Sequence, residues 1–141
     1  MTLYAETSAV LRWLFNEPQG DVILDQLRNA AKVATSRLTL VEARRAIRRA
    51  SREAGLASAQ RAKVLSALAL AASRWALLDL SRAVVERAES EFPVEPIRTL
   101  DALHLASALV LREALPDLVV LSTDDRLRGN ALELGFAVLP V

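Results

Sequence analysis

The segment LVVLSTDD, residues 118–125, places an apolar run directly before two adjacent acids. A run of this length without a polar interruption predicts a strand that is buried on both faces, as strands of parallel sheets are. Further segments with the character of strands lie on both sides of it, at residues 2–5, 33–35, 75–80 and 136–140. The buried strand and its neighbours therefore favour a mainly parallel sheet of about five strands.

Longer segments with helical spacing of their apolar residues separate these strands. They are expected at residues 7–15, 21–29, 38–54, 58–73, 81–89, 100–115 and 125–134. Ser58, Ser81 and Thr99 are candidate N-cap residues, and Gly55 and Gly135 end two of the helices. Strands that alternate with helices predict an α/β protein in which helices cover both faces of the sheet.

The composition limits the class of protein. At 141 residues the chain is expected to form a single domain, residues 1–141, with one core. It has no cysteine, which excludes disulfides and thiolate metal sites and fits a cytoplasmic protein. The N-terminus does not resemble a signal peptide, and the longest apolar run, residues 65–72, is too short to span a bilayer. We therefore expect a cytoplasmic protein without a membrane partner.

Acidic residues stand at several predicted strand and helix boundaries. Glu6 ends the first strand. Asp124 and Asp125 follow the buried strand, and Asp101 lies in the first turn of a helix. Glu42 lies at the margin of the apolar face of the 38–54 helix. Because the carboxyl ends of parallel strands share one edge of the sheet, these acids would lie near each other if the chain folds as predicted.

Each of these acids also has an ordinary structural explanation. Aspartate in a first helical turn complements the helix dipole, and aspartate after a strand is a typical turn or cap residue. Glu42 is spaced to pair with Arg45 or Arg49 on its own helix. If the acids instead converge, their mutual repulsion requires protons or a cation. An all-oxygen site selects Mg²⁺ or Mn²⁺, and phosphodiester hydrolysis is the chemistry that such an ion supports.

Four segments of the chain, taken in order, resemble the motifs of PIN-domain proteins. They are LYAETSAVLRWLF at 3–15, LTLVEARRAI at 38–47, RTLDALHLASALVL at 98–111 and LSTDDRLRGNALELGFAVLPV at 121–141. Together they resemble, in particular, the small VapC-type toxins of bacterial toxin–antitoxin pairs. The resemblance implies a PIN-like three-layer α/β/α domain. It also implies an endoribonuclease that depends on Mg²⁺ or Mn²⁺, cleaves RNA, is usually a homodimer and is held inactive by a cognate antitoxin.

The resemblance also assigns site residues by position. The four acidic positions of the family, which imply catalytic residues and metal ligands, fall on Glu6, Glu42, Asp101 and Asp125, with Asp124 as the less favoured alternative to Asp125. Glu42 is expected to act mainly through water. Auxiliary or substrate contacts are implied for Thr7, Ser8, Thr123 and Arg98. Most family members carry aspartate where this chain has Glu6, so the backbone or bridging waters must absorb one extra methylene.

Other features are expected to support the site or to form surfaces. His104, the only histidine, is expected to pack or hydrogen-bond beneath the site rather than to act as a base. The apolar segment 64–72 is expected in the core, with a portion left for a dimer or antitoxin groove, and Trp13 and Trp75 are expected in the core or an interface. A stripe of arginines on the 38–54 helix is either solvated or contacts RNA or an acidic partner; it comprises Arg44, Arg45, Arg48, Arg49 and Arg52.

Other classes of function fit the sequence less well. A phosphatase with an aspartate nucleophile would need a D-x-D arrangement after the first strand, where this chain has Ala5-Glu6-Thr7. A nucleotide-binding protein would need a glycine-rich phosphate loop, and the chain has only four glycines. A PIN fold that has lost catalysis and acts by binding RNA or an antitoxin stays an alternative, because Glu6 replaces the usual aspartate.

Overall fold

The computed structural model describes residues 1–141, and its centre is a five-stranded sheet in which all strands run parallel. The strand order is β3-β2-β1-β4-β5, so the chain builds outward from β1 on one side and then on the other. The strands are β1 (Thr2–Ala5), β2 (Lys32–Ser36), β3 (Ala76–Leu78), β4 (Leu118–Leu121) and β5 (Val138–Leu139). The predicted parallel sheet of five strands is confirmed.

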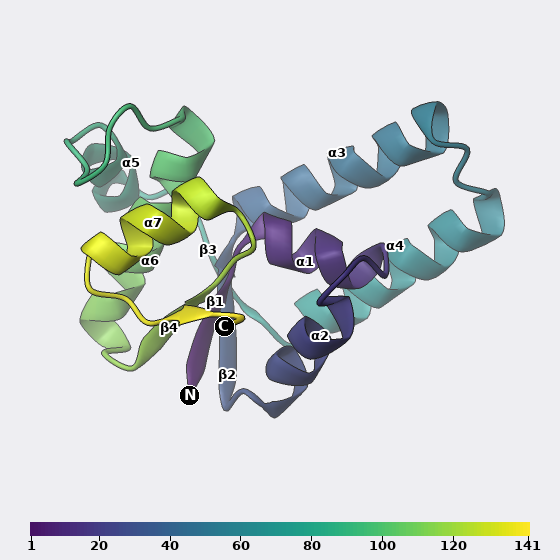
Figure 1. Cartoon of the computed structure of the whole chain (residues 1–141), viewed down its shortest axis with the longest axis horizontal. Helices are drawn as coiled ribbons and strands as arrows, with labels where there is room; N and C mark the ends of the chain where they lie inside the picture. The colour runs from purple at the N-terminus through teal and green to yellow at the C-terminus, as the bar shows by residue number, and fades with distance from the viewer.

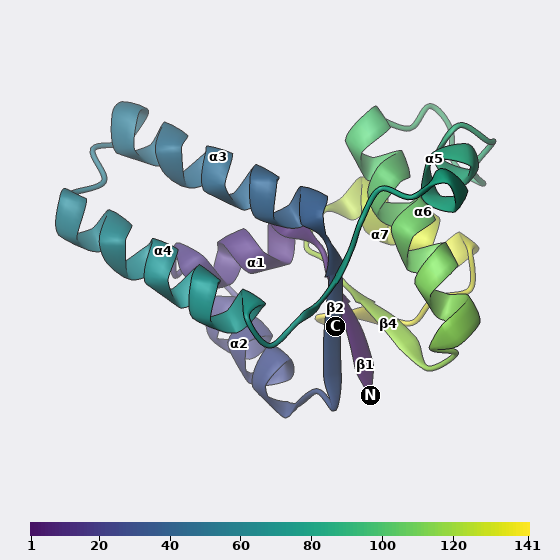
Figure 2. The same ribbon diagram turned by 180° about the vertical axis from the view of Figure 1, so that it is seen from behind.

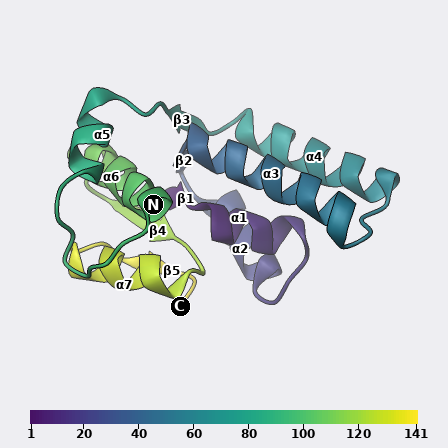
Figure 3. The same ribbon diagram turned by 90° about the horizontal axis from the view of Figure 1, so that it is seen from above.

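Helices cover both faces of this sheet and complete a three-layer α/β/α architecture, as predicted. Helices α1–α4 lie on one side of the sheet and α5–α7 on the other (Figure 3). No helix is both long and apolar enough to cross a membrane. The helices are α1 (Thr7–Leu14), α2 (Gly20–Asn29), α3 (Arg37–Glu53), α4 (Ser58–Ala72), α5 (Arg82–Ala88), α6 (Thr99–Ala114) and α7 (Asp125–Glu133).

The central strand β1 shows why both helix layers are needed. Successive side chains of a strand point to opposite faces, and all four side chains of β1 are buried. Leu3 and Ala5 pack with residues of the α1–α4 layer, whereas Tyr4 packs with residues of α6 and α7. A strand with this burial needs apolar cover on both sides.

Helices α3 and α4 form a hairpin that extends beyond the sheet (Figures 1 and 2). Ala43, Ile47 and Leu68 pack the two helices into the core. All five arginines of the predicted stripe on α3 are exposed, and none lies within ion-pairing distance of an acid. The stripe is therefore a cationic surface without an intramolecular partner.

Two of the three predicted caps differ from the structure. Helix α4 begins at Ser58 itself, and α6 begins at Thr99, with Arg98 in the N-cap position; neither N-cap makes a side-chain cap hydrogen bond. Ser81 caps α5 as predicted, because its hydroxyl accepts a hydrogen bond from the Val84 N–H. The Arg98 side chain therefore does not cap α6 and is available for contacts outside this helix end.

The edge strands β3 and β5 are shorter than predicted. Each has a single neighbour in the sheet, so the ladder of hydrogen bonds ends where the chain turns away from that neighbour. Only residues 76–78 and 138–139 stay within pairing distance of β2 and β4. Apolar character continues beyond these residues, which explains why the sequence pattern overestimates both lengths.

Candidate functional site

A cleft of about 350 Å³ opens at the carboxyl end of the sheet. It lies where the neighbouring strands β1 and β4 end, at the point where the strand order reverses, which is the usual ligand position in an open parallel sheet. Its lining comes from the start of α1, from α3, from the start of α6 and from the segment after β4. The lining residues are Glu6, Thr7, Ser8, Leu11, Glu42, Arg98, Thr99, Leu100, Asp101 and Asp124.

Glu6 follows β1 directly and is the N-cap residue of α1. The residue is only 5% exposed. Its Oε2 accepts hydrogen bonds from the Ser8 N–H (3.1 Å), from the Ser122 hydroxyl (2.8 Å) and from the Ser8 hydroxyl. Burial raises the pKa of Glu6, and the nearby His104 ring and the hydrogen bonds from Ser8 and Ser122 offset this effect only in part. Glu6 is therefore a desolvated acid whose ionised form a cation would stabilise.

Glu42 projects from α3 and is held by residues of α1 and α6. Its Oε1 accepts a hydrogen bond from the Thr7 hydroxyl (2.7 Å) and lies 2.5 Å from Nε2 of His104. On the other side of the ring, Nδ1 of His104 lies 2.8 Å from the Tyr4 hydroxyl. Burial is the main cause that raises the pKa of Tyr4, so this hydroxyl keeps its proton. Nε2–H of His104 can therefore donate to Glu42, while the Tyr4 hydroxyl holds the opposite nitrogen of the ring.

These contacts decide the charge of Glu42. Burial alone would raise its pKa, but the hydrogen bond and charge of His104, the hydrogen bond from Thr7 and the charge of Arg98 lower the pKa overall. Glu42 is thus ionised and fixed in place at neutral pH. As predicted, His104 lies beneath the cleft, where it orients an acid instead of facing a substrate.

Asp101 and Asp124 are bridged by one arginine. The Nε of Arg98 donates to Oδ2 of Asp101 (2.8 Å), and its Nη2 donates to Oδ2 of Asp124 (3.0 Å). The other oxygen of Asp124 caps α7, because Oδ1 accepts hydrogen bonds from the N–H groups of Arg126 and Leu127. The hydrogen bonds and charges of both carboxylates raise the pKa of Arg98.

The donor chemistry of the cleft fits a hard divalent cation. Glu6, Glu42 and Asp101 each commit one carboxylate oxygen to protein donors, and the second oxygen of each accepts no protein hydrogen bond and is not sealed from solvent. Carboxylate oxygens are the ligands that Mg²⁺ and Mn²⁺ prefer. No three acidic or histidine side chains lie close enough to form a direct ligand cluster as they stand. The guanidinium of Arg98 lies between two of the candidate acids.

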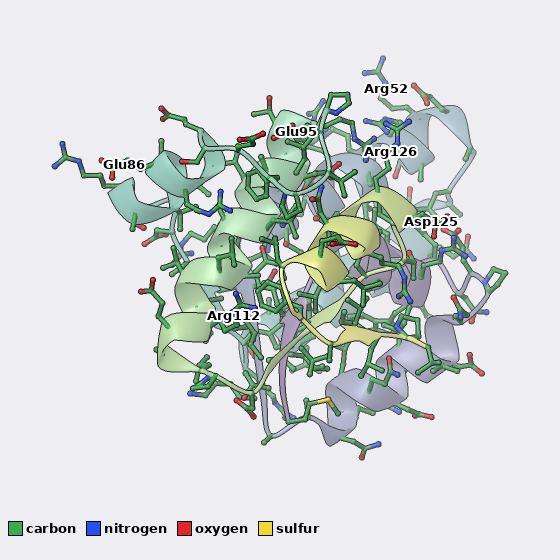
Figure 4. All side chains as sticks on the ribbon, turned by 60° about the vertical axis from the view of Figure 1, so that its left-hand side comes forward. Arg52, Glu86, Glu95, Arg112, Asp125 and Arg126 are labelled. Atoms are coloured by element: carbon green, nitrogen blue, oxygen red, sulfur yellow. The ribbon has the colours of Figure 1, made fainter.

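The structure places Asp125, the residue favoured as the fourth acid, outside the lining of the cleft. Asp125 is exposed at the first residue of α7 (Figure 4) and lines a different surface pocket together with Thr123 and Arg128. Asp124, the less favoured alternative, lines the cleft instead. The reason is local: Asp124 takes the N-cap position of α7, so its side chain lies beside the cleft while the next residue starts the helix.

Of the auxiliary residues predicted for the site, three line the cleft and one lines the neighbouring pocket. Thr7, Ser8 and Arg98 line the cleft with the acids, as expected. The backbone N–H of Thr123 donates to the Ser8 hydroxyl at 2.9 Å, and the residue lines the neighbouring pocket. The auxiliary role of the Thr123 hydroxyl stays a prediction.

Two residues that support the site are not predicted from the sequence. Ser122 donates to Glu6 and accepts a hydrogen bond from the Asp124 N–H (3.1 Å), so it connects the segments that follow β1 and β4. Tyr4 orients His104 from within β1. The sequence signals are a hydroxyl directly after the buried strand and the only tyrosine of the chain within β1; neither specifies a partner without the fold.

Comparison with known proteins places the chain in a family. Residues 3–132 match the model of the PIN domain. Ribonuclease VapC35 of Mycobacterium tuberculosis is 32% identical over 139 residues, which cover 97% of this chain and 95% of that protein. Ribonuclease VapC46 of the same species is 33% identical over 137 residues, with coverages of 97% and 95%.

Solved structures share the fold at lower identity. A toxin–antitoxin complex from Klebsiella pneumoniae matches with a TM-score of 0.64 at 17% identity, over 99% of this chain and 97% of that chain. VapBC2 from Rickettsia felis, bound to a DNA fragment from its promoter, matches with a TM-score of 0.65 at 13% identity, over 99% and 98%. The structural likeness supports the fold, and the family model together with the two relatives shows that this chain belongs to the PIN-domain family, as a VapC-type member.

Proposed function

We propose that the chain is an endoribonuclease toxin that hydrolyses RNA phosphodiester bonds with the help of Mg²⁺ or Mn²⁺. The observation that carries this proposal is the convergence of four acids from separate segments on one cleft: Glu6, Glu42, Asp101 and Asp124. The two relatives that are named ribonucleases support the substrate class. In this proposal Asp124 replaces Asp125 as the fourth acid.

The four acids are the residues that would hold the ion, some of them through water. A bound Mg²⁺ or Mn²⁺ would lower the pKa of a water molecule and stabilise negative charge on a phosphoryl oxygen. The protein side chains supply orientation. Thr7 and His104 hold Glu42 in one position, so its second oxygen does not need to be ordered during the reaction. Arg98 is the cationic side chain of the cleft and can contact the phosphate of an RNA strand.

We also propose that a cognate antitoxin binds an apolar groove on the α1–α4 side. The groove has a volume of about 540 Å³ and is lined by residues of α1, α2, β2, α4 and the segment after α4, including Trp13, Leu70 and Trp75. Basic residues of the lining, among them Arg28 and Arg74, favour a partner with an apolar segment and neighbouring acids. Two solved structures of the same fold are toxin–antitoxin complexes, which supports this partner class.

We propose that residues 1–141 form one domain, that the protein acts in the cytoplasm, and that it forms a homodimer. Light scattering tests the homodimer, because it measures the mass of the protein in solution. A result of about 15.4 kDa, the mass of one chain, would contradict the homodimer.

A binding module without catalysis is the second candidate function. The observation that favours it is the lack of a ready-made cluster of three metal ligands. Calorimetric titration with Mn²⁺ separates the two candidates. A catalytic site takes up Mn²⁺ in a manner that depends on Asp101, whereas a binding module shows no such uptake.

The proposed activity is tested most simply with Asp101→Asn. Asn keeps the shape of the side chain and removes its charge, so we expect cleavage of RNA with Mn²⁺ to fall by roughly 100-fold or more. Circular dichroism and thermal melting check that the variant is folded. Cleavage by the wild-type protein is expected to stop when the metal is chelated. Unchanged cleavage by folded Asp101→Asn protein would contradict the assignment.

A further inference from the structure

Arg98 holds two acids of the cleft that come from different parts of the chain. It precedes Asp101 by three residues at the start of α6, while Asp124 follows β4. Two different nitrogens of the guanidinium are used, Nε for Asp101 (2.8 Å) and Nη2 for Asp124 (3.0 Å). One planar cation therefore spans the space between the two carboxylates, which a lysine could not do in the same way.

Arg98 is also the only arginine or lysine that pairs with the acids of the cleft. The remaining ion pairs of the molecule either lie elsewhere or join Glu42 to His104. Four carboxylates in one cleft repel each other unless cations are present. In the protein without a metal ion, Arg98 supplies this compensation for Asp101 and Asp124.

The contact also conflicts with metal binding at Asp124. Oδ1 of Asp124 is committed to the N-terminus of α7, where it accepts two backbone hydrogen bonds. Asp124 can therefore offer the cleft only Oδ2, and this is the oxygen that Arg98 already holds. A cation that binds Asp124 directly must displace the guanidinium. The Arg98 side chain is 57% exposed, so it is free to swing into solvent.

We propose that Arg98 is an internal counter-ion that holds Asp101 and Asp124 in the metal-free protein and that a divalent cation displaces it. The proposal rests on the metal site of the proposed function. Once displaced, the guanidinium lies at the mouth of the cleft, beside the place where an RNA phosphate would bind. The same side chain thus competes with the metal ion in the resting state and binds substrate in the loaded state.

The test compares the affinity for Mn²⁺ in the full chain, measured by calorimetric titration without RNA. Removing a competing charged hydrogen bond is expected to tighten Mn²⁺ binding by Arg98→Gln about tenfold. Arg98→Lys keeps the charge without the bridge and is expected to give an intermediate affinity. The control is Arg126→Gln, which removes an equal charge near the cleft, from an exposed residue with no ion pair.

A second measurement separates displacement from a general change in charge. With the metal chelated, Arg98→Gln is expected to melt at a lower temperature than the wild-type protein, and Mn²⁺ is expected to raise its melting temperature by more. Equal affinities for Mn²⁺ in wild-type, Arg98→Gln and Arg126→Gln proteins would overturn the proposed role of Arg98 as a counter-ion. Weaker binding by Arg98→Gln would overturn it as well. Failure of both wild-type and Arg98→Gln proteins to bind Mn²⁺ would instead overturn the metal site, and with it the proposed function.

Discussion

At Glu6 a carboxylate is almost sealed from water and yet shares a cleft with three other acids. Three hydrogen-bond donors surround one of its oxygens, but they do not fully offset the loss of hydration, and its pKa is raised. An acid with a raised pKa in the native state destabilises the fold when it is ionised. Such a residue is retained where its charge has a use, which is the pattern of a functional site.

Replacing Glu6 by Gln is therefore expected to stabilise the metal-free protein while it abolishes cleavage. Because the native pKa is raised, the folded protein binds a proton that the unfolded chain has released, and stability falls as the pH rises through the interval between the two pKa values. Gln keeps an acceptor for the two serines and carries no charge. We expect a gain of about 1 kcal/mol at neutral pH, or roughly 3–5 °C in Tm.

Thermal melting with the metal chelated, at several pH values, measures this gain. The control Glu133→Gln changes an exposed acid of α7 and is expected to alter stability by less than about 0.5 kcal/mol. A Glu6→Gln protein that is less stable than wild type at neutral pH would show that the ionised form is not strained.

His104 offers a second test at the scale of one residue, because each of its ring nitrogens has a different partner. A Gln amide reaches roughly the position of Nε2, whereas an Asn amide reaches that of Nδ1. His104→Gln is thus expected to keep the donor to Glu42 and much of the cleavage rate. His104→Asn is expected to lose roughly 10- to 100-fold in rate, as is typical when a partner that orients a metal ligand is removed.

Both His104 variants lose packing and are expected to melt at lower temperatures, so stability does not separate them. The cleavage rate of folded protein does. Equal rates for the Gln and Asn variants would mean that His104 only fills space beneath the cleft.

At the scale of elements, helix α4 serves two purposes. Leu68 and Ala72 pack into the core beside α1 and α3, whereas Leu70 is 65% exposed and lines the apolar groove. The apolar character of segment 64–72 thus reflects core packing on one face and an exposed surface on another. Exposed apolar surface of this kind marks interaction sites.

A charge placed in this groove is expected to weaken binding of the proposed antitoxin. Leu70→Glu replaces an apolar contact of the groove with a charged side chain that must be desolvated in the complex, and we expect a loss of at least about 2 kcal/mol, or roughly 30-fold in affinity. The control Leu132→Glu alters a residue of α7 that is similarly exposed, at 58%, but lies outside the groove. Affinity for the cognate antitoxin is measured by calorimetry. Equal loss in both variants, or none in Leu70→Glu, would place the antitoxin elsewhere.

For the whole molecule, the sequence alone predicts the fold well because its signals are local and repeated. The buried run 118–121 and the alternation of strands with helices suffice for a parallel three-layer architecture. Edge strands are harder to predict, since their ends depend on where a single neighbour stops. The start of α6 is also hard to predict: Thr99 has the character of a cap residue, but it is the first residue of the helix.

The site is predictable in outline and not in detail. Glu6, Glu42 and Asp101 line the cleft as expected, because each has a fixed relation to a strand end or a helix face. The fourth acid depends on a shift of one residue: Asp124 takes the cap of α7, and Asp125 starts the helix outside the cleft. The bridge made by Arg98 and the support that Tyr4 gives to His104 both depend on contacts between distant segments.

The central claim is that the acids of this cleft carry out RNA cleavage, and the adjacent pair Asp124 and Asp125 tests it most directly. Both changes to Asn remove one charge at the start of α7, and Asn at position 124 keeps the oxygen that caps the helix. With Mn²⁺ and a fixed RNA substrate, we expect Asp124→Asn to lose roughly 100-fold or more in cleavage rate, and Asp125→Asn to stay within about threefold of wild type. A loss in Asp125→Asn with full activity in Asp124→Asn, or full activity in both, would contradict the account.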